Sequence, residues 1–84
     1  MNEASPRQPT WSRPADRNIL EFLDDRGAEY PAIVANRIGM HAPYVETRCV
    51  ELAERGLLEA VSGEVVYRIT EAGKRACESG ALPE

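Results

Sequence analysis

The stretch from Pro31 to Leu58 restricts the fold more than any other part of this sequence. It begins with a proline, which suits the first turn of a helix, and its apolar residues recur at helical spacing over 31–38. Gly39 favours the left-handed conformation that ends a helix. A second helix is expected over 42–55, where apolar residues recur at i, i+4, i+7 and i+8, and Gly56 ends it. Two short helices around a three-residue turn that contains glycine are typical of a helix-turn-helix.

The N-terminal side adds one more helix and a segment without a core pattern. Residues 1–12 are polar and rich in proline, so we expect a flexible arm there. Trp11 is expected to pack onto the domain, with a ligand contact as the alternative. A helix is expected from Pro14 to Asp25, because proline is favoured in a first turn. The polar residues of this helix, Asp16 among them, are expected to be solvated.

The C-terminal side changes to the periodicity of strands. Two runs over 57–61 and 65–69 are typical of a β-hairpin, and Thr70 is a good N-cap for a last helix over 71–78. A hairpin directly after the second helix of a helix-turn-helix makes a winged helix. We therefore predict a mainly α fold with a small β-hairpin (α+β), a winged helix-turn-helix of order α-α-α-β-β-α. The predicted domain covers residues 13–79 and is followed by a tail over 80–84.

The charge of the chain fits DNA binding poorly. Its 84 residues include 14 acidic and 10 basic ones, which gives a net charge of −4, whereas a nucleic-acid-binding protein is expected to carry a basic face. Nine of the basic residues are arginine and one is lysine. This composition suggests a protein that stays soluble in concentrated salt, and a GC-rich genome is the alternative explanation.

Composition also argues against several classes of protein. No apolar run approaches the ~20 residues of a membrane span, and the N-terminus lacks the apolar core of a signal peptide, so we expect a cytoplasmic protein. Cys49 and Cys77 are expected to be unpaired thiols. With one histidine and no Cys-x-x-Cys pair, we expect no metal and no other cofactor. No convergent set of catalytic groups is evident, so an enzyme is not expected.

Two runs of sequence carry a family resemblance. VETRCVELAERGLL, from Val45 to Leu58, resembles the end of the recognition helix in winged helix-turn-helix regulators. YRITEAG, from Tyr67 to Gly73, is similar to the segment that follows the wing in the same group. The likeness covers about residues 11–79 and is strongest to small archaeal winged-helix proteins, especially repressor-like ones of halophiles and their phages. It implies a repressor-like transcriptional regulator whose second motif helix enters the major groove of double-stranded DNA.

The helical wheel and this resemblance together select ten candidate DNA-contacting residues. We expect Thr47 to meet a base edge or a thymine methyl group, Arg48 a guanine or a phosphate, and Glu46 a cytosine amino group. His41 either contacts phosphate or is a plain turn residue. The full set is His41, Pro43, Tyr44, Glu46, Thr47, Arg48 and Val50 around the second helix, with Arg37, Arg68 and Arg13 as further cations.

The charge of the second helix leaves another hypothesis open. Over 42–55 there are three glutamates and two arginines, so the glutamates alternatively form a solvated acidic face. Few phosphate contacts favour a homodimer that reads two half-sites ~34 Å apart, with the last helix and Trp11 as the expected dimer contact. In the alternative reading, the winged helix binds a basic protein partner and no DNA. No membrane or small-molecule partner is expected in either case.

Overall fold

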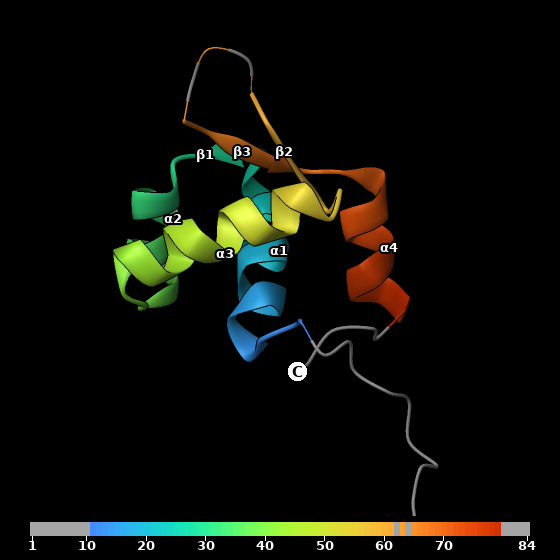
Figure 1. Cartoon of the computed structure of the whole chain (residues 1–84), viewed down its shortest axis with the longest axis horizontal. Coiled ribbons are helices and arrows are strands. Elements are labelled where there is room, and N and C mark those ends of the chain that lie inside the picture. Colours follow the sequence, from blue (N-terminus) through green and yellow to red (C-terminus); the bar gives the residue numbers. More distant parts are fainter. Residues whose placement is uncertain (1–10, 62, 64, 80–84) are drawn as a thin grey trace, which may run out of the picture.

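Four helices and a three-stranded antiparallel sheet make up the described part of the chain, residues 11–61, 63 and 65–79, in a computed structural model (Figure 1). The elements in chain order are α1 (Pro14–Arg26), β1 (Ala28–Glu29), α2 (Pro31–Ile38), α3 (Ala42–Glu54), β2 (Leu58–Ala60), β3 (Tyr67–Ile69) and α4 (Glu71–Ser79). This order confirms the predicted winged helix-turn-helix and adds one strand. The first ten residues of the predicted arm and the predicted tail lie outside the described residues.

Helices α2 and α3 form the helix-turn-helix at the predicted place. Pro31 occupies the first turn of α2, and Gly39 ends this helix in the left-handed conformation, with φ 74° and ψ 37°. The Gly39 amide donates a hydrogen bond to the carbonyl oxygen of Ala35. His41 then precedes α3 without a capping hydrogen bond from its side chain. The proline and glycine that marked these boundaries in the sequence therefore do so for the expected physical reason.

The wing is the β2–β3 hairpin, and β1 extends it to a sheet of order β1-β3-β2. Strand β1 pairs Ala28 with Arg68 and Glu29 with Tyr67, both antiparallel. The sequence analysis missed this strand, because two residues are too few to show the alternation that identifies one. Residues 62 and 64 of the predicted turn lie outside the described residues.

The core forms where α1 meets the helix-turn-helix and the first strand of the wing. Its largest fully buried side chains include Ile19, Leu20, Leu23, Val34, Val45, Cys49, Leu52 and Leu58. Cys49 is a core residue, as predicted. Trp11 also packs against this core while remaining partly exposed, which confirms the expectation that it packs onto the domain.

Helix α4 packs on the opposite end of the sheet from α2 (Figure 1). The Gly73 amide donates to the Thr70 hydroxyl at 3.0 Å, which confirms Thr70 as the N-cap. A Cβ at Gly73 would overlap the carbonyl oxygen of Leu57 and the side chain of Ile69. The glycine of the YRITEAG run is therefore required for the close approach of α4 to the strands. None of the described helices has the length and apolar content that crossing a bilayer requires.

Candidate nucleic-acid interface

Helix α3 presents an outward ridge of exposed side chains, made of Pro43, Thr47, Val50 and Glu54. The Thr47 hydroxyl donates to the carbonyl oxygen of Pro43 at 3.0 Å, so its lone pairs and its methyl group stay available. Val50 is 44% exposed. The outward ridge contains no cation. Its chemistry suits thymine methyl groups and amino donors on base edges, and not phosphates.

Asp16 and Arg48 are both buried, so the prediction that Asp16 is solvated is wrong, and Arg48 does not lie on the exposed face that its expected DNA contact requires. Arg48 Nε donates to Asp16 Oδ1 at 2.9 Å, and Arg48 Nη2 donates to Asp16 Oδ2 at 2.8 Å. Nη2 also donates to the carbonyl oxygen of Trp11 at 3.0 Å. Asp16 is fully buried and Arg48 is 9% exposed. Arg48 therefore joins α3 to α1 and is removed from the set of side chains available to DNA.

The hydrogen bonding explains how two charged groups are buried together. A buried carboxylate is costly unless a cation and further donors satisfy it. Besides the two bonds from Arg48, Asp16 Oδ2 accepts the backbone amide of Arg13 at 2.9 Å, at the start of α1. Hydrogen bonding to the Asp16 carboxylate raises the pKa of the Arg48 guanidinium, which stays charged. The helical wheel placed Arg48 beside the exposed face but carried no information about a partner 32 residues away.

Arg55, the other arginine of the predicted second helix, is also paired within the protein. Its guanidinium lies 4.4 Å from the centroid of the Trp11 ring, and its Nε donates to Glu51 Oε2 at 2.6 Å. Glu46 and Glu54, in contrast, form no ion pair with any described residue. The surface over residues 42–55 is therefore more acidic than its three glutamates and two arginines suggest.

The remaining candidate cations lie on neighbouring elements. Arg37 is exposed in the last turn of α2 and forms no ion pair within the described part of the chain. Arg68 lies in β3, where its Nε donates to Glu59 Oε2 at 2.6 Å across the hairpin. Arg13 is exposed just before α1. His41 and Tyr44 are exposed at the start of α3, next to the outward ridge. The start of α3 and the end of α2 thus bring together His41, Pro43, Tyr44, Thr47 and Arg37, whereas Arg68 and Arg13 belong to other parts of the fold.

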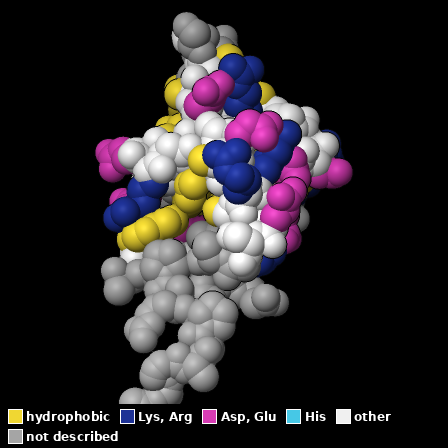
Figure 2. All heavy atoms as spheres, turned by 90° about the vertical axis from the view of Figure 1, so that its right-hand side faces the viewer, with side chains coloured by type: hydrophobic (Ala, Val, Ile, Leu, Met, Phe, Trp, Pro, Cys, Tyr) yellow, Lys and Arg dark blue, Asp and Glu magenta, His cyan; other side chains and the backbone are white. Residues whose placement is uncertain are grey.

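The side of the molecule that carries α4 does not offer a competing basic face. Figure 2 shows this side with basic and acidic side chains interspersed and no broad patch of either charge. Arg17 pairs with Glu21 at 2.7 Å, and Lys74 lies 3.8 Å from Glu71. This distribution leaves the start of α3 as the better candidate for a nucleic-acid contact.

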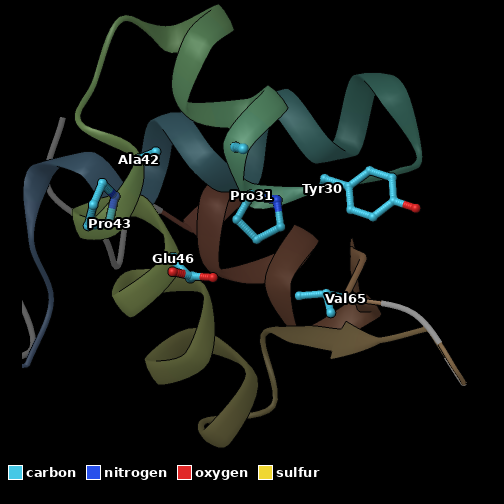
Figure 3. Close-up of a pocket in the computed structure, with 7 residues that line it drawn as sticks. Tyr30, Pro31, Ala42, Pro43, Glu46 and Val65 are labelled. Carbon is cyan, nitrogen blue, oxygen red and sulfur yellow. The ribbon is translucent and has the colours of Figure 1, made fainter.

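A pocket of about 230 Å³ opens beside the N-terminal half of α3 (Figure 3). Its lining residues are Tyr30, Pro31, Ala32, Ala42, Pro43, Glu46 and Val65. No pattern in the sequence predicts this pocket, because the lining comes from the start of α2, the start of α3 and the wing. Glu46, a candidate base contact, is the one charged member of this set.

The four-helix arrangement, the winged sheet and the exposed start of α3 define a winged helix-turn-helix protein. A family model described as winged helix-turn-helix phage repressor matches residues 6–84, and the chain belongs to this family. A search among curated proteins found no match. Within the described residues, no group of three or more His, Cys, Asp or Glu side chains is placed to hold a metal ion.

Solved structures with the same fold include one described as a transcriptional repressor and one described as repressor-like. The PhiH1 repressor-like protein from Haloarcula marismortui is 29% identical, with a TM-score of 0.75 over 93% of this chain and 89% of its own. The antimony-specific transcriptional repressor AntR is 27% identical, with a TM-score of 0.64 over 76% of this chain and 60% of its own. A MarR family protein from Bacillus stearothermophilus, 23% identical with a TM-score of 0.71, shares the fold over 80% of this chain. This chain spans about half of that protein, 49% of its length.

Proposed function

We propose that this protein binds double-stranded DNA sequence-specifically as a repressor-like transcriptional regulator, with the N-terminal half of α3 in the major groove. The observation that carries the proposal is the exposed start of α3 in a member of the phage repressor family. Two solved structures of similar fold are described as a repressor and as repressor-like. The second helix of a helix-turn-helix reads bases with its N-terminal residues, which here are exposed and uncovered by other described elements.

The proposed contacts divide into base readers and phosphate binders. Thr47 and Val50 on the outward ridge offer methyl groups to thymine, and Glu46 remains a candidate acceptor for a cytosine amino group. Arg37 is the proposed phosphate contact, supported by His41 in the turn, with Arg13 and Arg68 as more distant cations. Arg48 acts as a positioning residue, because its bonds to Asp16 fix the rotation of α3 against α1.

With so few cations, one subunit would bind DNA weakly, and we propose a homodimer that reads two half-sites ~34 Å apart. The last helix and Trp11 remain the proposed dimer contact. Trp11 also stacks on Arg55 within its own chain, so only the part of its ring that stays exposed is available. Sedimentation at tens of micromolar, with and without duplex DNA, tests this state, and a monomer under both conditions would contradict it.

A binding titration on a duplex selected from a random pool tests the proposed function. Thr47→Ala should weaken binding to the selected duplex by about tenfold while leaving random duplex unaffected. Arg37→Ala should weaken both and lower the salt slope by about one unit. Arg26→Ala is the matched control, because Arg26 is an exposed arginine in the last turn of α1, outside the proposed DNA and dimer contacts, with no ion pair among the described residues. Equal effects of all three variants, or none, would contradict the proposed interface.

A second candidate function is a protein-interaction module, and the pairing of Arg48 and Arg55 within the protein favours it. Their pairing leaves Glu46 and Glu54 as the unpaired charges on α3. A basic protein partner would complement this surface better than a phosphate backbone does. This alternative predicts no measurable duplex binding even at low salt, and recovery of a basic partner by pull-down.

A further inference from the structure

The pocket beside α3 combines apolar walls with one carboxylate among its described lining residues (Figure 3). Tyr30, Pro31 and Ala32 form the wall at the start of α2, and Val65 faces them from the wing. Tyr30 is 47% exposed and Val65 is 62% exposed, so part of the apolar lining of the pocket is open to water. Apolar surface that stays open to water in this way favours an apolar ligand group.

Glu46 determines the charge of that ligand. Its carboxylate forms no ion pair with a described residue, whereas Arg48 pairs with Asp16 on α1 and Arg55 pairs with Glu51 on α3. A carboxylate accepts hydrogen bonds only, so its partner must be a donor. Charge-assisted bonds to a cation are about twice as strong as neutral ones. A phosphate or another anion would be repelled from the same place.

The dimensions of the pocket limit the ligand to one small ring. Its volume of about 230 Å³ lies below the ~300–1,000 Å³ of pockets that hold drug-sized molecules. The aromatic ring of Tyr30 and the two proline rings offer flat surfaces, and a flat cation also gains from the π face of an aromatic ring. A planar amidine or guanidine matches a carboxylate through two parallel hydrogen bonds, which a point-like ammonium does not.

We propose that this pocket binds a small planar organic cation, an amidine or guanidine carried on a single apolar ring, with Glu46 as the acceptor. The ring lies between the walls formed by Tyr30, Pro31 and Val65. This binding does not depend on the proposed DNA function. Pro43 belongs both to the pocket and to the outward ridge, so the bound cation lies beside the surface proposed to meet DNA.

A titration of the DNA-free protein with benzamidine, followed by amide chemical shifts, tests the inference. We expect saturable shifts that concentrate on the pocket residues, and affinity for benzamidine at least tenfold higher than for benzyl alcohol or benzoate, which carry the same ring without the positive charge. Shifts that do not saturate, or that spread over the whole surface, would overturn the proposal. So would equal binding of the three probes.

Three variants assign the binding to this pocket. Glu46→Gln keeps the shape of the side chain and removes its charge, and we expect it to weaken benzamidine binding by about tenfold or more. Glu54→Gln is the matched control, an unpaired and exposed glutamate of the same helix outside the pocket, and should leave the affinity unchanged. Ala32→Leu should abolish binding by filling the space while Glu46 stays intact. An equal loss in Glu46→Gln and Glu54→Gln would show general electrostatic attraction and would overturn the proposal.

Discussion

The two flanks of α3 differ in whether their charged side chains are paired within the protein. On the flank toward α1, Arg48 pairs with buried Asp16, and Arg55 pairs with Glu51 while stacking on Trp11. On the flank toward the wing, Glu46 lines a pocket without any cation from the described residues. The first flank uses its charges to hold the helix in place, and the second leaves its charge for a ligand. The charges counted along the sequence of a helix therefore do not predict the net charge of the surface that a binding partner contacts.

Substitutions on the flank toward α1 should lower the free energy of unfolding more than substitutions on the flank toward the wing. Arg48→Ala leaves the Asp16 carboxylate buried without its cation, and breaking a buried pair in this way costs about 3–5 kcal/mol. We expect the midpoint of thermal unfolding to fall by more than ~10 °C. Urea and thermal unfolding of the two proteins measure both quantities.

Removing both partners of this pair provides the control. Asp16→Leu combined with Arg48→Met replaces the pair by apolar side chains and should cost much less than the sum of the two single changes. An Arg48→Ala variant as stable as the wild type would contradict the assignment of the pair as the anchor of α3.

Cys49, on the buried face between the two flanks, should make stability depend on alkaline pH. Burial raises the pKa of its thiol to about 12, and the negative charges of Asp16 and Glu46 add to the rise. The pKa of the thiol in the unfolded chain is about 9.0. The contribution of Cys49 to the free energy of unfolding is therefore fully present below pH 9 and declines as the pH rises toward 12. Between pH 8 and pH 10 we expect a loss of about 1.4 kcal/mol from this group. Urea titrations at the two pH values measure the loss, and Cys49→Ala should show a difference smaller by that amount.

Arg55 lies on the same flank as Arg48, but its partners lie at the surface. The two arginines therefore compare an exposed pair with a buried one. Arg55→Ala should cost about 1 kcal/mol, from one exposed cation–π contact and one i,i+4 ion pair. The Trp11 fluorescence should change with the loss of the stacked guanidinium. Urea unfolding monitored by this fluorescence tests the prediction, and a cost comparable to that of Arg48→Ala would remove the distinction between buried and exposed pairs.

On the flank toward the wing, removing the charge of Glu46 should strengthen DNA binding, whereas removing an ordinary DNA contact weakens it. If Glu46 faces phosphates, Glu46→Gln relieves repulsion and should strengthen binding to random duplex about threefold at low salt, with less effect at high salt. Glu54→Gln gives the corresponding value for the outward ridge. A weaker complex only with duplexes that carry cytosine at one position would instead assign Glu46 to base reading.

The sequence predicted the parts of the fold that local chemistry determines. Pro31 and Gly39 delimit α2, Thr70 caps α4, and the apolar spacing around Cys49 gives the buried side of α3. Each of these signals depends on residues within one or two helical turns of one another. The family resemblance carried by the runs after Val45 and after Tyr67 agrees with the matched family model.

The candidate site was less predictable because its decisive contacts join distant segments. The wheel placed Arg48 beside the exposed face, and only the fold brings Asp16 within 2.9 Å of it. The pocket around Glu46 likewise needs Tyr30 and Val65, which lie on either side of it in sequence. Long side chains at the edge of a helix face can turn inward or outward, and the partner that decides between them lies elsewhere in the chain.

The salt dependence of duplex binding tests the central claim most directly. The account predicts saturable binding of double-stranded DNA at ~50 mM salt, followed by fluorescence anisotropy, with an affinity that falls as salt rises. Because Arg48 and Arg55 are paired within the protein, the logarithmic slope should be shallow, about −1 to −4. Absence of binding at low salt and tens of micromolar protein would contradict the account and leave the protein-interaction function as the better description of this winged helix.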